Sequence, residues 1–178
     1  MSCQNIVLIG FMGSGKSSIG RLLSKKLGFQ FVDTDRVIIE RAGMEISDIF
    51  AQHGEGYFRD LESTTLASLT HLRRCIIATG GGVVLRETNR ALLSGLGFVV
   101  GLTADEEVIF ERVSRNAKRP LLQTENPRET VRRILNERLN LYEAAAQFTV
   151  DTSQLTYEQI AEIIINEVRR AFQWQSAP

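Results

Sequence analysis

The residues whose types and spacing are best suited to chemistry lie near the start of the chain, from Gly10 to Ser17. This segment reads Gly-Phe-Met-Gly-Ser-Gly-Lys-Ser, which is the spacing of a phosphate-binding loop. Its glycines let the backbone curl so that successive N–H groups point at one anion, and a helix starting there adds partial positive charge. The loop therefore predicts a nucleoside triphosphate site formed by Gly13, Ser14, Gly15, Lys16, Ser17 and Ser18.

Two side chains of this loop have distinct expected roles. Lys16 would reach the β- and γ-phosphates, and the hydroxyl of Ser17 would bind Mg²⁺. The apolar segment 6–9 precedes the loop, and a helical pattern follows it. A chance match on a glycine-rich turn would lack this strand and this helix, so the context favours the phosphate-binding interpretation.

A second group of candidate residues follows two further apolar segments. Asp33 and Asp35 come after segment 29–32, and we expect both side chains on the same side of an extended segment. One carboxylate would order Mg²⁺, directly or through water, and the other would accept a hydrogen bond from a substrate hydroxyl, although a solvated turn remains the alternative. Glycines after segment 75–78 offer backbone that a small molecule can approach closely, and they also suit a plain turn: Gly80, Gly81 and Gly82.

Arginines supply the candidate anion contacts. Arg59 follows Glu55 by one helical turn, so it fits either a ligand contact or a surface ion pair. Arg119 lies in a segment without apolar periodicity, which predicts a mobile loop where an arginine either meets the transferring phosphate or is ordinary surface charge. Arg138 is one of several arginines on its predicted helix, and spacing alone does not distinguish it from the others.

Apolar segments that alternate with helical patterns must position these residues. The expected strands are 5–9, 29–32, 75–78, 98–102 and 148–151. This alternation indicates βαβ units, and hence an α/β three-layer sandwich with a five-stranded parallel sheet of the P-loop kinase type. Ligands of such sheets bind at the carboxyl ends of the strands, which is where the candidate residues fall.

Capping signals predict where the helices begin and end. Ser47 is expected to cap a short helix that Gly54 ends, and a second helix runs over 55–69. Thr103 would open a capping box, and Asn126 would cap a helix that has Pro127 at its first position. The last helix starts after Thr156 and should bury Ile160, Ile163, Ile164 and Val168.

Length and composition indicate one domain over residues 1–178. Within it, residues 34–72 are longer than one crossover helix requires and predict a substrate-binding insertion, and residues 113–126 predict the lid. Lys+Arg and Asp+Glu are equal at 21 each, so no global basic field favours nucleic acid or an anionic membrane. No apolar run approaches the ~20 residues of a membrane span, and no signal peptide is expected before the first strand.

The remaining residue types favour a cytoplasmic protein. Cys3 and Cys75 are too few for a disulfide framework, so we expect reduced thiols. His53 and His71 lack ligand spacing to the cysteines, and no zinc site is expected. Without an identifiable broad apolar patch, a monomer is expected.

Taken together, these motifs closely resemble the shikimate kinase family over residues 5 to about 168. They occur in the family's order: Gly13-Ser-Gly-Lys-Ser17, Asp33-Thr-Asp35, Phe58-Arg59-x-x-Glu62, Thr79-Gly-Gly-Gly82, Arg119-Pro-Leu-Leu122 and Arg138-x-x-x-Tyr142. The resemblance implies transfer of the ATP γ-phosphoryl group to the 3-hydroxyl of shikimate, with Mg²⁺ as cofactor, in the pathway to aromatic amino acids.

The resemblance also implies roles for individual residues. Those matching Asp35, Arg59, Gly82 and Arg138 hold the substrate: the aspartate takes hydroxyls and the arginines clamp the carboxylate. Arg119 matches a lid arginine that folds over the phosphates and completes the catalytic set with Lys16 and Asp35. The residue matching Asp33 supports Mg²⁺ mainly through water, beside Ser17. Arg112 matches an arginine near the adenine, and two aromatic residues match pocket walls that could equally be core: Phe50 and Phe58.

Two alternatives stay open from the residues. Another small P-loop kinase, for gluconate or a nucleoside monophosphate, would share the phosphate loop, although the compact pair of Arg59 and Asp35 suits a hydroxy acid better. A non-catalytic ATP-binding module would be favoured by loss of Lys16, Asp35 or a clamp arginine, and all are present. At residues 151–154 the chain lacks basic residues that some family members carry next, and no adenine contact is predicted there.

Overall fold

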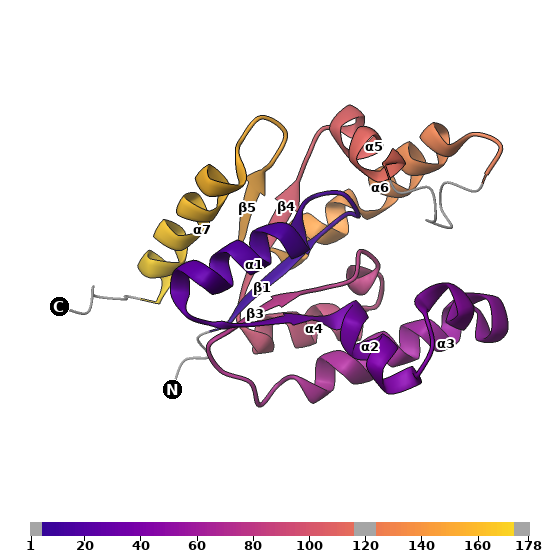
Figure 1. Cartoon of the computed structure of the whole chain (residues 1–178), viewed down its shortest axis with the longest axis horizontal. Coiled ribbons are helices and arrows are strands. Elements are labelled where there is room, and N and C mark those ends of the chain that lie inside the picture. Colours follow the sequence, from indigo (N-terminus) through magenta and orange to yellow (C-terminus); the bar gives the residue numbers. More distant parts are fainter. Residues whose placement is uncertain (1–4, 116–123, 173–178) are drawn as a thin grey trace.

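Five parallel strands form one sheet at the centre of the computed structural model, which describes residues 5–115 and 124–172 (Figure 1). The strands are β1 Ile6–Gly10, β2 Gln30–Asp33, β3 Cys75–Ala78, β4 Phe98–Thr103 and β5 Phe148–Asp151. They pair in the order β2-β3-β1-β4-β5. This order places β1, which leads into the glycine loop, at the centre of the sheet and confirms the predicted fold class.

Helices cover both faces of this sheet. They are α1 Lys16–Leu27, α2 Thr34–Ala42, α3 Ile46–Ser68, α4 Glu87–Leu96, α5 Glu106–Ser114, α6 Pro127–Ala145 and α7 Tyr157–Ala171, with a short 3₁₀ helix, η1 Val83–Leu85. Successive side chains of β1 point to opposite faces. Ile6 and Leu8 pack into the core that α1 and α7 share, whereas Val7 and Ile9 pack into the core beneath α4 and α6. Burial on both faces explains why the strand is apolar throughout.

A small third core lies apart from the sheet, between α2 and α3. Ile38, Ile49 and Phe58 are buried in it. The α2–α3 region lies beside the carboxyl end of β2 (Figure 1), and it is the stretch that the sequence analysis expected to be an insertion. The apolar contacts of this core hold α3 in place, and Arg59 is a residue of this helix.

Two sequence predictions about this region were wrong. Asp33 and Asp35 do not share an extended segment, because Asp33 is the N-cap of α2 and Asp35 is in its first turn. Ser47 is not a helix cap, since α3 begins at Ile46 after Glu45. Gly54, with φ 80° and ψ 173°, breaks α3 where a helix end was predicted. A left-handed φ of this kind is readily adopted by glycine.

The predicted caps at Asn126 and Thr156 are confirmed, whereas the predicted cap at Thr103, several strand ends and one buried position differ. The Asn126 side chain accepts a hydrogen bond from the Glu129 N–H at 3.2 Å, and Thr156 forms a full capping box with Gln159. Thr103 instead ends β4, and α5 starts after Asp105 without a side-chain cap. Strand β1 starts at Ile6 rather than at residue 5. Ile163 is 37% exposed, and the buried face of α7 is completed by Ala161 and Ile165.

The predicted lid is described only in part. Val113 and Ser114 belong to α5, whereas Arg119 lies outside the described residues, as does Cys3. Cys75, at the start of β3, is a buried thiol that donates to the Arg73 carbonyl oxygen at 3.4 Å. Among the described helices, none has the length and apolar character that a membrane crossing requires.

Candidate active site

The glycine loop is held in a conformation that requires glycine. Gly10, Gly13 and Gly15 have φ values of 142°, 82° and 97°. A Cβ at Gly10 would lie 2.3 Å from the Leu102 carbonyl oxygen, so β4 also excludes a side chain there. The Lys16 ammonium donates to the carbonyl oxygens of Gly10 and Phe11, each at 2.8 Å. The loop thus curls around its own lysine at the N-terminus of α1, an arrangement suited to phosphate.

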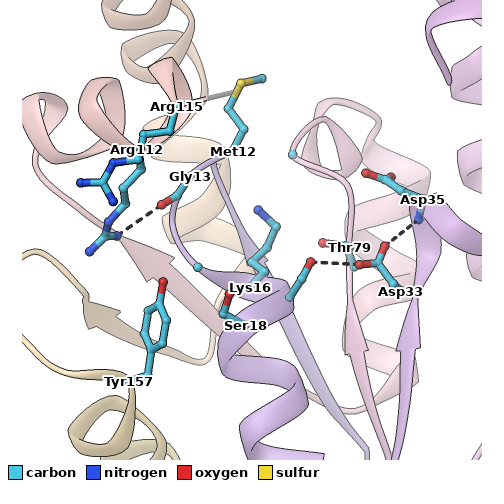
Figure 2. A pocket seen from close by; sticks show the side chains of 13 residues that line it. Met12, Gly13, Lys16, Ser18, Asp33, Asp35, Thr79, Arg112, Arg115 and Tyr157 are labelled. Atoms are coloured by element: carbon cyan, nitrogen blue, oxygen red, sulfur yellow. Dashed lines mark hydrogen bonds between the residues drawn. The ribbon is translucent and has the colours of Figure 1, made fainter. Parts of the chain in front are cut away.

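A chain of hydrogen bonds links this loop to the end of β2 (Figure 2). The Ser17 hydroxyl donates to Asp33 Oδ2 at 2.9 Å, and Asp33 Oδ1 accepts from the Asp35 N–H at 3.2 Å. Asp33 is therefore fixed from both sides. Its carboxylate and the serine hydroxyl are hard oxygen donors, the kind that Mg²⁺ prefers while it keeps several waters. No group of three or more histidine, cysteine or acidic side chains suited to a metal occurs among residues 5–115 and 124–172.

One cavity brings most of the predicted site residues together. Its lining combines the glycine loop with residues from the end of β2, the start of α2, the turn after β3, the end of α5 and the start of α7: Met12, Gly13, Gly15, Lys16, Ser17, Ser18, Asp33, Asp35, Thr79, Gly81, Arg112, Arg115 and Tyr157. Ser14 does not line it, because this residue is fully buried. Asp33, Asp35 and Gly81 are the members of the second group of predicted residues that line this cavity.

Arg112 is anchored over the outer side of the loop. Its Nη1 donates to the Gly13 carbonyl at 3.3 Å and to the Thr152 hydroxyl at 3.0 Å, and its Nη2 donates to the Thr152 carbonyl at 2.8 Å. Tyr157, the first residue of α7, is 43% exposed and lines the same cavity (Figure 2). Thr152 and Tyr157 were not predicted as site residues, because both follow β5 at a large sequence distance from the loop.

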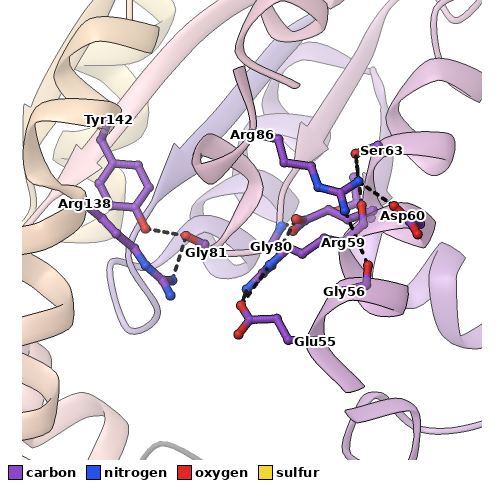
Figure 3. A network of polar contacts seen from close by, with 12 residues as sticks. Glu55, Gly56, Arg59, Asp60, Ser63, Gly80, Gly81, Arg86, Arg138 and Tyr142 are labelled. Carbon is purple, nitrogen blue, oxygen red and sulfur yellow. Dashed lines mark hydrogen bonds and ion pairs between the residues drawn. The ribbon is translucent and has the colours of Figure 1, made fainter. Parts of the chain in front are cut away.

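The second part of the site centres on Arg59 (Figure 3). Its Nη2 pairs with Glu55 at 2.9 Å and its Nη1 with Glu62 at 3.0 Å, while the guanidinium lies 5.1 Å from the centre of the Phe58 ring. The surface pair that spacing allowed does form, yet the Arg59 side chain is only 11% exposed. Phe50 and Phe58 pack together with ring centres 4.8 Å apart, as part of the small α2–α3 core.

Gly80, Gly81 and Gly82, which follow β3 and are called the glycine segment, leave room for these charged side chains. A Cβ at Gly82 would lie 2.1 Å from Arg59 Nη1. A Cβ at Gly80 would lie 2.7 Å from Asp35 Oδ1 and 2.9 Å from Glu62 Oε1. Since atoms cannot approach so closely, side chains at these positions would displace the arginine and both carboxylates. The absence of side chains at Gly80 and Gly82 therefore lets the arginine and both carboxylates occupy these positions.

Glu62 is the buried acid of this group. It is 1% exposed, and its loss of solvation raises the pKa of its carboxyl above the usual value, while the neighbouring Arg59 acts in the opposite direction. Sequence reasoning named Glu62 only as part of a motif. The separation of three residues from Arg59 was the available signal, because it places both side chains on one helical face.

Arg138 and Tyr142 approach the glycine segment from α6 (Figure 3). Arg138 Nη1 donates to the Gly81 carbonyl at 3.3 Å, and the Tyr142 hydroxyl donates to the same oxygen at 2.5 Å. Burial raises the pKa of Tyr142 to about 12, so its hydroxyl remains a neutral donor. The structure thus selects Arg138 from the arginines of α6, which spacing alone could not do.

The arrangement suits transfer of a phosphoryl group between two bound molecules. On one side, the glycine loop and Lys16 line a cavity in which their N–H groups could bind an anion. Asp35 and two arginines, Arg59 and Arg138, gather around the glycine segment on the other. Such reactions need mainly positioning and neutralisation of charge, which these groups supply.

Comparison with known proteins agrees with this geometry. The family model described as shikimate kinase matches residues 12–169. A shikimate kinase from Thermodesulfovibrio yellowstonii is 53% identical over 167 residues, which cover 94% of this chain and 96% of that protein. One from Geobacter sulfurreducens is 43% identical over 166 residues, covering 93% and 91% of the two chains.

Solved structures give the same result. Shikimate kinase from Acinetobacter baumannii in complex with shikimate has a TM-score of 0.90 and 37% identity, covering 95% of this chain and 94% of that one. A gluconokinase from Sinorhizobium meliloti is 17% identical with a TM-score of 0.55, a similarity that shows the shared fold alone. The extent of the matches, over almost the whole chain, shows that this protein belongs to the shikimate kinase family.

Proposed function

We propose that this chain transfers the γ-phosphoryl group of ATP to the 3-hydroxyl of shikimate, giving shikimate 3-phosphate and ADP. One observation carries the proposal: Asp35 and Gly81 line the same cavity as Lys16 and Ser17. An acceptor held by the carboxylate and the glycine segment would therefore meet the end of a triphosphate bound in the loop. Membership of the shikimate kinase family supports the identity of that acceptor.

The loop would hold the triphosphate. Backbone N–H groups from Gly13 to Ser18 would surround the β-phosphate, and Lys16 would exchange its loop carbonyls for the β- and γ-phosphates. Arg112 would lie beside the nucleoside, because it stands over the outer side of the loop. Arg119, outside the described residues, would bring a further positive charge to the phosphates from the lid.

Mg²⁺ fits the donors at the end of β2. The Ser17 hydroxyl would bind the ion, and Asp33 would hold it, mainly through water. When bound, the ion would neutralise charge on the β- and γ-phosphate oxygens. Both donors already lie within hydrogen-bond distance of each other, so little rearrangement is needed to face one ion.

Side chains would bind the acceptor. Arg59 and Arg138 offer planar forks that match a carboxylate, and both lie against the glycine segment, Arg59 at Gly82 and Arg138 at Gly81. Asp35 would orient the 3-hydroxyl and accept its proton as the oxygen attacks the γ-phosphorus. The bond from that phosphorus to the bridging oxygen then breaks, and ADP leaves with the electron pair.

The same proposal covers the organisation of the chain. Residues 1–178 form a single domain in which 34–72 serve as the substrate-binding insertion and 113–126 as a lid that excludes water during transfer. The protein acts as a cytoplasmic monomer on small molecules, without nucleic acid or membrane partners. Balanced charge, with 21 basic and 21 acidic side chains, supports the absence of nucleic acid and anionic membrane partners.

A coupled ADP-release assay tests the reaction. Purified protein with Mg-ATP is given shikimate, gluconate, AMP or no acceptor, and the product is identified by mass spectrometry. Rapid ADP release only with shikimate, together with a phosphorylated shikimate, is the expected result. ADP release that does not depend on shikimate, or that prefers gluconate or AMP, would contradict the proposal. Omission of Mg²⁺ should abolish turnover if Ser17 and Asp33 hold the ion.

A further inference from the structure

Thr152 is a fully buried polar residue at the point where β5 ends and the turn to α7 begins. Its N–H donates to the Thr103 carbonyl at 2.8 Å, which extends the pairing of β4 and β5 by one bond. This backbone bond fixes the residue whatever its side chain is. The hydroxyl is therefore available for a separate task.

That hydroxyl lies at a junction of three elements. It accepts from Arg112 Nη1 at 3.0 Å and is within donating distance of the carbonyl oxygens of Thr103, at 2.9 Å, and Ser14, at 3.3 Å. The Thr152 carbonyl accepts from Arg112 Nη2 at 2.8 Å. One residue thus holds both terminal nitrogens of the guanidinium, and the same guanidinium donates to the Gly13 carbonyl at 3.3 Å.

The contact with Ser14 reaches the phosphate-binding backbone itself. The peptide bond between Ser14 and Gly15 is planar, so the Ser14 C=O and the Gly15 N–H point in opposite directions within one plane. The single hydroxyl proton is shared between the Thr103 and Ser14 carbonyl oxygens, and its donation to Ser14 would fix the direction of the Gly15 N–H. Gly15 lines the cavity, and this N–H is one of the groups that a bound phosphate would meet.

We propose that Thr152 is a positioning residue for the nucleotide, acting through Arg112 on one side and through the Ser14–Gly15 peptide on the other. It holds the guanidinium beside the nucleoside and keeps the loop in its phosphate-binding shape before ATP arrives. The inference rests on the proposed ATP site but not on the identity of the acceptor. Preorganisation of this kind strengthens nucleotide binding by reducing what must be ordered on binding.

The test replaces the hydroxyl and leaves the backbone bond. Thr152→Val removes an acceptor for a charged donor, so we expect roughly a ten-fold or larger increase in the ADP dissociation constant and in KM for ATP. KM for shikimate should change by less than about two-fold, because no contact of Thr152 reaches the glycine segment. Thr152→Ser, which keeps the hydroxyl, should restore nucleotide affinity. Calorimetry with ADP reports binding even if the acceptor has been misidentified.

A double-mutant cycle separates this role from a merely structural one. In an Arg112→Ala background, the loss of ADP affinity caused by Thr152→Val should shrink, since one of its two routes is gone. Thr70→Val, at an exposed threonine after α3 whose hydroxyl donates to the Ala67 carbonyl oxygen at 2.9 Å, is the matched control and should behave as wild type.

Three outcomes would overturn the proposal. They are unchanged ADP affinity in Thr152→Val, an equal rise in both KM values, and failure of Thr152→Ser to restore binding. If Thr152→Val lacks a cooperative unfolding transition, Thr152→Ala replaces it under the same criteria, because it removes the hydroxyl without placing a methyl group against the guanidinium.

Discussion

The two halves of the proposed site differ in whether backbone or side chains form them. The nucleotide half, residues 10–18 with Arg112, is mostly backbone: its shape comes from glycine dihedral angles, and its lysine bonds to the loop's own carbonyls. The acceptor half consists of side chains from three helices gathered around the glycines after β3: Asp35, Arg59, Glu62, Arg138 and Tyr142. One half is local in sequence and the other is assembled by the fold.

This difference has an energetic consequence. In the nucleotide half, the backbone N–H donors remain in any variant that keeps the loop's conformation. A substitution of a charged side chain there therefore removes that charge and few other interactions. In the acceptor half, Arg59 is paired with Glu55 and with the buried Glu62, and removal of one partner leaves another charge unpaired. Substitutions there should spread to neighbouring side chains, whereas those in the loop should stay local.

Lys16→Ala provides the largest expected effect in the nucleotide half. Loss of the ammonium removes positive charge at the transferring phosphoryl group, and turnover should fall by about 10²- to 10³-fold or more. The ADP-release assay measures this, with circular dichroism to establish that the fold is retained. Lys25→Ala, on the exposed side of the same helix, is the control and should keep normal turnover. Normal turnover in Lys16→Ala would remove the lysine from the mechanism.

Asp35→Asn should have the next largest effect. The amide keeps the shape of the side chain but cannot accept the hydroxyl proton, and kcat should fall about 10²-fold or more. Because Asp35 Oδ1 and Glu62 Oε1 both lie against Gly80, the substitution should also change the shikimate KM, as expected for a coupled site. Asp48→Asn, in the exposed first turn of α3, is the control. A kcat close to that of wild type would show that another group takes the proton.

Arg138→Ala should act on affinity more than on rate. The guanidinium is the carboxylate-binding fork of α6, so KM for shikimate should rise at least about ten-fold, as expected for a charge-assisted hydrogen bond. KM for ATP should stay within about two-fold. Arg133→Ala removes an arginine of the same helix that pairs with Glu137 on the surface, and it should leave both KM values unchanged. An unchanged shikimate KM in Arg138→Ala would mean that the clamp has been misassigned.

The same contrast explains what could be predicted from the sequence. A contiguous motif predicted the loop residues of the nucleotide half one by one, and the structure places them along one cavity with Ser14 as the exception, whereas Arg112 came from the family resemblance alone. Strand order and the selection of Arg138 required tertiary contacts, since several arginines of α6 share its local pattern. The error at Asp35 concerns one boundary: because α2 starts at Thr34, Asp35 is in a helical turn and not in an extended segment.

Thr152 marks the limit of local reasoning. Its partners Arg112 and Ser14 lie 40 and 138 residues away, and only the pairing of β5 beside β4 brings them together. Nothing in the residues around Thr152 indicates a contact with the loop. Glu62, by contrast, had a local signal in its spacing from Arg59, but its burial beneath the glycine segment depends on how α3 packs.

Glu62→Gln should give the smallest effect, seen in stability as a function of pH. Burial raises the pKa of Glu62 in the folded state above its ordinary 4.5, so the folded protein binds more protons than the unfolded chain just above that value. Stability from this group is therefore fully present below pH 4.5 and is lost as pH rises through the folded pKa, by about 1.4 kcal/mol for each unit of the shift.

Urea unfolding across this pH range measures the effect as a difference between the two proteins. Relative to Glu62→Gln, which cannot titrate, the wild type should lose free energy of unfolding as pH rises above 4.5. The absolute stabilities do not decide the matter, since the substitution also weakens the pairing with Arg59. Parallel pH profiles would show that the carboxyl titrates alike in both states. Burial of the Glu62 carboxyl would then have no free-energy cost that depends on pH, and this difference between the acceptor half and the nucleotide half would be lost.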